Sequence, residues 1–442
     1  MAVYGQVTNK RQKTVKEIGR NADTNEFFPG LGRVEFRPDS GPEDTLCFHY
    51  YNATERIHGK TMEEWIRPSI SFWHAFCYTG SDYYGQPTFQ RSWDDGTHTI
   101  DNYKRRIRAA FEFYNKLGNK FWTLSDMDIA PEGDTIDETH HNLDEITELI
   151  LELQQKSNVR PLWVSANLHS QPRYVQGAAT SSDAQVVGYA GSQLKKSLEL
   201  ALKLGAECFM FRGWREGYNT LLNTDLPREL RNYSRLLKMT AEYKDRLGYR
   251  GQLLFDSTYH NNWSVYKEQS TNQQKLHYHY NPDPMSSLYL LKHYNLERQY
   301  KLATTPGHQL VLTSAFTSTF CSQFGFCPQP SLEGGMQPGG LNIGVPLRRG
   351  STEVKDLLVA YISCIDVYAR GLRNAAKVIA DGLFTKNLQQ QYLSFHSGFG
   401  SRLNNGEVTL EDCEDQAHKH PRDTNVSSQR PEHWEAVFNH YI

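Results

Sequence analysis

Residues 103–134, "YKRRIRAAFEFYNKLGNKFWTLSDMDIAPEGD", predict a helix followed at once by a strand. Ile107, Phe111 and Tyr114 recur at helical spacing, and Gly118 is a typical residue for the end of a helix. The aromatic run that comes next predicts a buried strand. A polar Ser-Asp-Met-Asp segment stands at the carboxyl end of that strand. The unit therefore delivers polar side chains to one end of a sheet.

The same alternation of helix and strand continues along the chain. Strands separated by amphipathic helices build a parallel sheet, either open or closed as a (β/α)8 barrel. The chain has no GxGxxG segment after its first clear strand and no P-loop, and polar strand ends favour a barrel with its site at the C-terminal mouth. We expect strands within 160–167, 207–213 and 250–257, and helices within 141–155, 186–205 and 227–248.

Composition restricts the partners and the compartment. The 48 basic and 50 acidic residues nearly cancel, which argues against broad binding to nucleic acid or to a membrane surface. No apolar run approaches the roughly 20 residues of a membrane span, and the N-terminus has no apolar core typical of a signal peptide. The seven cysteines form no CxxC pair and are interpreted as reduced thiols. We therefore expect a cytoplasmic protein.

The polar and Gly/Pro-rich segments divide the chain. A long polar loop and a Gly/Pro-rich stretch interrupt the alternation, and polar segments stand at both ends. The predicted parts are a polar N-terminal arm over 1–26, a barrel over 27–350 with an inserted loop at 256–283 and a shortened region at 321–341, a helical arm over 351–414, and a polar linker with an amphipathic tail over 415–442.

The tail carries an apolar stripe. Trp434, Val437, Phe438 and Tyr441 stand at i, i+3, i+4 and i+7, which predicts an amphipathic helix. Two interpretations are equally favoured. The stripe binds a groove on a neighbouring protein, or it packs back on its own barrel. These four residues are the candidates for partner contacts.

Several blocks of the sequence resemble xylose isomerases of the longer, class II type, in order from about residue 27 to about residue 417. The resemblance implies a (β/α)8 barrel plus a C-terminal helical arm, with which family members grip neighbouring subunits in a tetramer. The blocks are "HGKTMEEWIRPSISFWHAFCYTGSD", "DIAPEGDT", "SANLHSQPRY", "REGYNTLLNTDLPREL", "PGGLN" and "DVYARGLRNAAKVIADGL".

The resemblance also implies a chemistry, a metal-assisted hydride shift between an aldose and a ketose. Two divalent ions held by carboxylates and one His polarise the substrate oxygens. A His oriented by an Asp opens the sugar ring, a Lys stabilises a negative oxygen, and Trp rings pack on the sugar.

Several of these positions differ in this chain. The His position falls on Ser125, which has no proton affinity near neutral pH, while its Asp partner remains as Asp128. The stacking Trp falls on Arg212, and the Lys falls on Thr258. We expect Asp126 and Asp128 to stabilise the loop by accepting backbone N–H bonds or by pairing with Arg215.

Most positions that hold metal ligands in the family carry other residues in this chain. One Glu is shortened to Asp256, the bridging Glu falls on Thr305, and the last liganding Asp falls on Gly344, while His308 matches. Two further ligand blocks, which cover the seventh strand and its helix, have no room within 320–339. We therefore predict no metal site and no cofactor. Either "SQFGFCPQP" replaces the seventh strand, or the barrel is incomplete there.

These departures predict a catalytically inactive relative of the xylose isomerases that serves as a structural or interaction component of a larger assembly. Its partners would be proteins, or further copies bound through the C-terminal arm, and a cytoskeletal or axonemal setting is one option. Two alternatives stay open. One is a sugar-binding regulatory module without turnover. The other is an isomerase with remodelled chemistry, which predicts a perturbed titrating group at the mouth together with a closed pocket.

Overall fold

The computed structural model describes residues 26–82, 85–257, 278–304, 338–419 and 428–441. Several predicted features lie outside these ranges: the N-terminal arm apart from its last residue, most of the inserted loop and of the shortened region, Thr258, Thr305 and His308.

The centre of the molecule is a parallel sheet of seven strands in the order β10-β8-β6-β5-β4-β3-β11. The strands are β3 Pro68–Ser71, β4 Phe121–Ser125, β5 Arg160–Ser165, β6 Cys208–Phe211, β8 Gln252–Asp256, β10 Tyr300–Ala303 and β11 Leu341–Ile343. Every pairing between neighbours is parallel. The predicted class, an α/β fold of the TIM-barrel type, is confirmed. Among the described residues the sheet ends at β10 on one side and at β11 on the other, and most of the chain that joins these two strands, residues 305–337, lies outside the described part.

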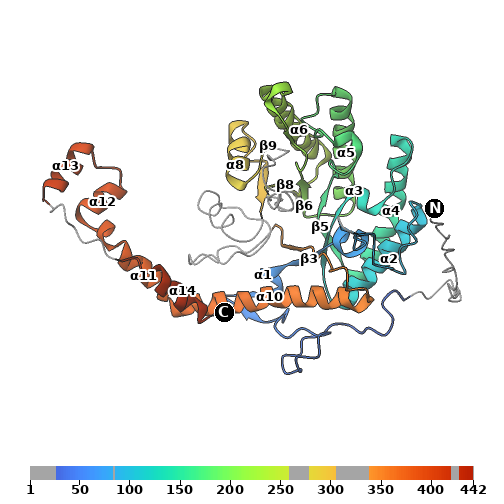
Figure 1. The fold of residues 1–442 in the computed structure, drawn as a ribbon, viewed down its shortest axis with the longest axis horizontal. Helices are drawn as coiled ribbons and strands as arrows, with labels where there is room; N and C mark the ends of the chain where they lie inside the picture. Colours follow the sequence, from blue (N-terminus) through green and yellow to red (C-terminus); the bar gives the residue numbers. More distant parts are fainter. Residues whose placement is uncertain (1–25, 83–84, 258–277, 305–337, 420–427, 442) are drawn as a thin grey trace, which may run out of the picture.

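Helices follow the strands and cover the outer face of the sheet (Figure 1). They are α2 Ile100–Leu117, α4 Ile136–Ser157, α5 Ala184–Lys203, α6 Leu226–Leu247 and α8 Pro284–His293. Local signals set their ends. The side chain of Thr99 accepts a bond from the Asn102 N–H at the start of α2, and Gly118 ends this helix with φ 76°.

The core has two layers, because side chains alternate along each strand. In β6, Phe209 and Phe211 join the large cluster shared with the helices, whereas Cys208 and Met210 join a smaller cluster on the other face of the sheet. That smaller cluster fills the interior of the curved sheet with residues from five strands: Phe121, Leu162, Trp163, Cys208, Met210, Leu254 and Ala303.

A long helix, α10 Val354–Asp381, runs beneath the barrel (Figure 1). It is fastened there by Asp366, whose carboxylate accepts bonds from the backbone N–H groups of His49, Tyr50 and Tyr51 at 2.8, 3.0 and 2.8 Å. No helix in the described part of the chain is long and apolar enough to cross a membrane.

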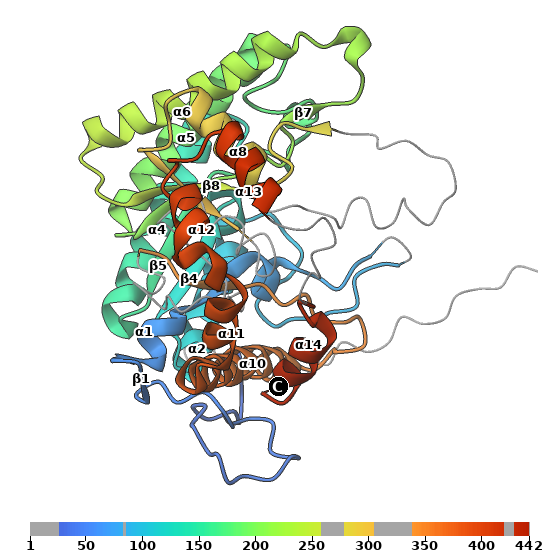
Figure 2. The ribbon, with the colours of Figure 1, turned by 90° about the vertical axis from the view of Figure 1, so that its left-hand side faces the viewer.

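Beyond α10 the chain leaves the barrel. Helices α11 Leu383–Gln391, α12 Gly398–Asn404 and α13 Leu410–Lys419 project away from it, and α14 Pro431–Asn439 lies back along the start of this arm (Figures 1 and 2). None of these four helices contains a buried residue. A helical arm after the barrel was predicted and is present.

The tail stripe packs on this arm. The ring of Phe384 in α11 lies 5.7 Å from Trp434, 6.4 Å from Phe438 and 6.4 Å from Tyr441, centroid to centroid. The hydroxyl of Tyr441 donates to Asp381 at 2.7 Å. The tail therefore folds back on the chain's own arm rather than on the barrel, and Val437 beside it is half-buried. That these residues bind a partner stays a prediction.

Candidate functional site at the barrel mouth

Polar residues from neighbouring strands meet at the carboxyl ends of the sheet, which we call the mouth. Ser71 ends β3, Ser125 ends β4, Ser165 ends β5 and Asp256 ends β8. Because the strands are parallel and in register, these ends lie side by side, and Ser125 is paired directly with Ser165. The Ser125 and Ser165 hydroxyl oxygens are 2.8 Å apart.

Arg212 is the residue that follows β6, and its side chain lies against the ends of β4 and β8. Its Nη1 donates to Ser125 Oγ at 3.4 Å, and its Nε lies 3.9 Å from Asp256 Oδ2. The guanidinium stands 4.9 Å from the ring centre of Trp214, whose Nε1 donates to the same Asp256 oxygen at 2.9 Å. Only 17% of the Arg212 side chain is exposed. A largely buried cation thus occupies the position where the resemblance placed an apolar Trp.

Asp128 faces this cation from the helical turn α3, Asp126–Ile129. Its Oδ2 accepts a bond from the Ser125 N–H at 3.1 Å, and the residue is 8% exposed. Burial raises the pKa of Asp128 to about 6, although Arg212 acts in the opposite direction. A carboxyl group that titrates near neutral pH at a strand end is suited to accept and return a proton.

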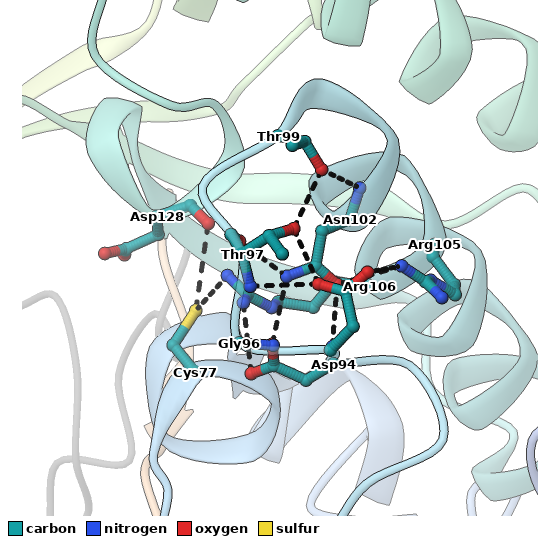
Figure 3. Close-up of polar contacts among 10 residues, drawn as sticks. Cys77, Asp94, Gly96, Thr97, Thr99, Asn102, Arg105, Arg106 and Asp128 are labelled. Carbon is teal, nitrogen blue, oxygen red and sulfur yellow. Dashed lines mark hydrogen bonds and ion pairs between the residues drawn. The ribbon is translucent and has the colours of Figure 1, made fainter.

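A polar network of Cys77, Arg106 and Asp94 contacts the backbone of Asp128 (Figure 3). Cys77, the last residue of a π-helical turn over Trp73–Cys77, donates from Sγ to the Asp128 carbonyl oxygen at 3.7 Å. Arg106 Nη1 lies 3.9 Å from that sulfur, and Arg106 Nη2 pairs with Asp94 Oδ2 at 3.1 Å. Burial raises the pKa of the Cys77 thiol well above its ordinary value. The thiol is therefore a neutral packing group and not a nucleophile.

Asp126, two residues earlier, has a different role. Its carboxylate accepts bonds from the Asn167 N–H at 2.8 Å, from Gln193 Nε2 at 2.8 Å and from Ser197 Oγ at 3.0 Å. These bonds tie the end of β4 to the loop after β5 and to α5. The expectation that the two carboxylates accept backbone N–H bonds is confirmed, but only Asp126 is saturated with donors.

The resemblance places Trp73 and His74 at the barrel mouth, although both residues would serve equally well in the core or at the rim. Ser71 Oγ lies 2.8 Å from His74 Nδ1. Burial and the charge of Arg212 lower the pKa of His74 to about 4, so the ring is neutral at physiological pH. The pairing of His74 with Ser71, three residues earlier at the end of β3, was not predicted.

The described donors do not fit the two-metal site that the resemblance implies. No group of three or more His, Cys, Asp and Glu side chains suited to a metal occurs in the described residues. Asp256 is already bonded by Trp214 and faces Arg212. Tight sites for hard cations need a nearly full shell of oxygen ligands. Thr305 and His308 lie outside the described residues, so the lost metal site stays a prediction.

The structure brings most of the sequence-predicted positions together. Ser125, Asp128, Arg212 and Asp256 form one cluster at the mouth. Gly344, just after β11, lies against the ring of His74. Thr258 falls outside the described residues.

The relatives of this chain agree with the blocks found in its sequence. A family model described as the XylA2 C-terminal domain matches residues 388–442. Xylose isomerase of Arabidopsis thaliana is 36% identical and covers 93% of this chain and 90% of its own length. The enzyme of Priestia megaterium is 38% identical over 90% and 94%, and that of Caldicellulosiruptor bescii 36% over 94% and 99%. Among solved structures, a D-psicose 3-epimerase with D-fructose has a TM-score of 0.40 at 9% identity, over 69% of this chain and 98% of that one.

These relatives correct one prediction. The chain was predicted not to be an enzyme, and this is wrong, because proteins 36–38% identical over about nine-tenths of it are named as enzymes. No observation on the described residues is positive evidence of inactivity. Missing ligands of one kind do not exclude a different chemistry at the same strand ends. With that identity over that length, the chain belongs to the xylose isomerase family.

Proposed function

We propose that this chain is a sugar isomerase that interconverts an aldose and the matching ketose by proton transfer at the mouth. The observation that supports this most is Asp128, a buried carboxyl group with a pKa of about 6 that faces the guanidinium of Arg212. An isomerase with remodelled chemistry was expected to have both a perturbed titrating group and a closed pocket at the mouth, and Asp128 supports the first of these two features. The names of the relatives supply the substrate class, a sugar.

The chemistry balances over the substrate, the Asp128 carboxylate and one group that relays a proton between the two sugar oxygens. The Asp128 carboxylate takes the proton from C2 of an open-chain aldose while the relay group gives a proton to the C1 carbonyl oxygen, which yields an enediol. Asp128 then returns its proton to C1 while the relay group takes a proton back from the O2 hydroxyl, so that C2 becomes the carbonyl of the ketose. Arg212 stabilises the negative charge that develops on the sugar oxygens. The proposed steps use no metal ion, and the described donors by themselves would not hold one.

The test uses the purified full-length protein with a panel of aldoses and ketoses in D2O. A proton held on Asp128 exchanges with solvent, so we expect deuterium at C1 of the ketose, whereas a direct hydride shift brings in none. Asp128→Asn should lower kcat/KM by about 10²–10⁴-fold. Asp137→Asn changes an exposed carboxylate in α4 and should match the wild type.

Three outcomes contradict the proposal. They are turnover without deuterium incorporation, full activity of Asp128→Asn, and a sugar that raises the melting temperature but is not converted. The last outcome would favour the sugar-binding module instead.

We further propose that copies of the chain associate through the C-terminal arm. The support is the absence of any buried residue in α11, α12, α13 and α14, together with apolar side chains such as Leu393 and Leu410, which are 65% and 85% exposed. Light scattering on the full-length protein should give a mass above one chain, which Leu393→Asp combined with Leu410→Asp should lower. An unchanged mass in this variant would contradict the proposal.

A further inference from the structure

Gly344 leaves room for the ring of His74. A Cβ atom at position 344 would lie 2.7 Å from His74 Nδ1 and 2.8 Å from its Cε1, closer than such atoms approach in proteins. Any side chain there would therefore force the imidazole to move. The space where the resemblance expects a liganding carboxylate is occupied in this chain by a histidine ring.

Two other elements fix the same ring. Ser71, at the end of β3, bonds Nδ1 at 2.8 Å, and no described side chain bonds Nε2. Arg212, at the end of β6, is the charged group whose field acts on the ring. His74 is therefore held at the mouth by contacts from β3, from β11 and from its own helical turn, with one ring nitrogen left for a ligand.

We propose that Gly344 is a positioning residue that seats His74 at the mouth, and that His74 is the neutral hydrogen-bonding group that serves the two sugar oxygens of the isomerisation. This second role rests on the proposed function. Because Nδ1 is bonded to Ser71, Nε2 is the nitrogen left for the sugar: Nε2–H gives its proton to O1 in the first step, and Nε2 takes a proton back from O2 in the second. A pKa well below the working pH keeps the imidazole neutral at the start.

The positioning of His74 by Gly344 is tested without any assay of activity. In protein labelled with ¹³C at histidine Cε1, NMR follows the titration of His74, and the loss of one signal in His74→Gln assigns it. We expect a midpoint of about 4 in the wild type. Gly344→Ala displaces the ring toward water, so its midpoint should rise toward the ordinary value of about 6.5. An unchanged midpoint would overturn the positioning role.

The matched control is Gly350→Ala. No atom lies within 4 Å of a Cβ at position 350, so this variant adds the same methyl group six residues later without a clash. It should leave the His74 signal where it is in the wild type.

If the NMR signal is lost, a double-mutant cycle measured by melting temperature tests the same contact. Gly344→Ala should lower the melting temperature by about 2–6 °C, because the added methyl group overpacks the ring. In a His74→Ala background the clash is gone, and the same change should cost less than about 1 °C. Equal losses in both backgrounds would show that the glycine does not act through His74.

Activity separates the two halves of the proposal. His74→Gln should lower kcat by about 10²–10⁴-fold with little change in KM. Gly344→Ala should lower kcat in the same direction, and Gly350→Ala should not. If the wild type converts no sugar at all, the proposed function fails, while the NMR titration still decides the seat of His74. If the wild type is active and His74→Gln is too, the catalytic half is wrong.

Discussion

The barrel and the C-terminal arm place similar residues in opposite surroundings. Trp122 in β4 is fully buried between sheet and helices, whereas Trp434 in α14 is half-buried against one phenylalanine of the same arm. In the barrel, even carboxylates such as Glu216 are enclosed and bonded. The difference teaches that the described barrel residues enclose the mouth within their own packing, while the described part of the arm leaves apolar side chains exposed.

The largest expected effect is on the core. Trp122→Ala should lower the free energy of unfolding by about 3–5 kcal/mol, because it removes a large buried ring and leaves a cavity. Denaturant unfolding measures this. The indole N–H of Trp122 has no partner in the described structure, so Trp122→Phe should cost less than half as much. If Trp122→Ala lowered the unfolding free energy by less than about 1 kcal/mol, the barrel core would tolerate the loss of a ring as well as the arm does.

The next effect concerns a buried carboxylate. Glu216 accepts bonds from the N–H groups of Ala178, Ala179 and Thr180 at 3.1, 3.0 and 2.9 Å, and from Thr180 Oγ1 at 2.7 Å. Glu216→Ala leaves these donors unpaired and should cost about 3 kcal/mol of unfolding free energy. Glu216→Gln keeps one oxygen acceptor and should cost clearly less. Equal stability of the alanine variant and the wild type would mean that water replaces the carboxylate at no cost.

The third effect depends on pH. The pKa of Asp128 is raised from 3.8 to about 6, so the folded protein binds this proton more tightly than the unfolded chain between these values. Stability should therefore fall by about 2 kcal/mol as pH rises from about 4 to about 6, through this group.

The Asn side chain of Asp128→Asn cannot titrate, so the unfolding free energy of this variant should lack the fall between pH 4 and pH 6 that Asp128 causes in the wild type. Denaturant unfolding at pH 4, 5, 6 and 7 gives both curves, with Asp137→Asn expected to follow the wild type. Parallel curves for the Asp128→Asn variant and the wild type would show that the group is not perturbed.

The smallest effect is on the arm. Trp434→Ala removes one ring contact with Phe384 and should lower the local stability of α14 by about 1 kcal/mol or less, with no change in the unfolding of the barrel. Hydrogen exchange followed by mass spectrometry should show faster exchange in α14 alone. Faster exchange in β4 as well would mean that arm and barrel unfold together.

The sequence predicted the fold well because its signals are local. The apolar period of α2, its Thr99 cap and Gly118 mark a helix wherever they occur, and the strands between such helices have few alternatives to a parallel sheet. The cluster of Ser125, Asp128, Arg212 and Asp256 could also be predicted, because each residue stands at the end of a strand or within three residues after it.

The chemistry of the mouth was harder to predict. Burial, not residue type, raises the pKa of Asp128, and its packing involves segments distant in sequence, such as Cys77, which lies 51 positions earlier. The seat of His74 depends on Gly344, 270 positions away and without a side chain to signal it. A comparison of residue types alone therefore led to an inactive protein, which the relatives contradict.

The bonds from residues 49–51 to Asp366 bridge 315 to 317 positions of the chain. During synthesis the early segment leaves the ribosome long before its acceptor carboxylate exists. It must wait in an unfinished state until α10 has emerged, and contacts of such long range slow folding. A ribosome stalled before this helix would thus hold strands β3 to β6 without the helix that lies beneath the barrel.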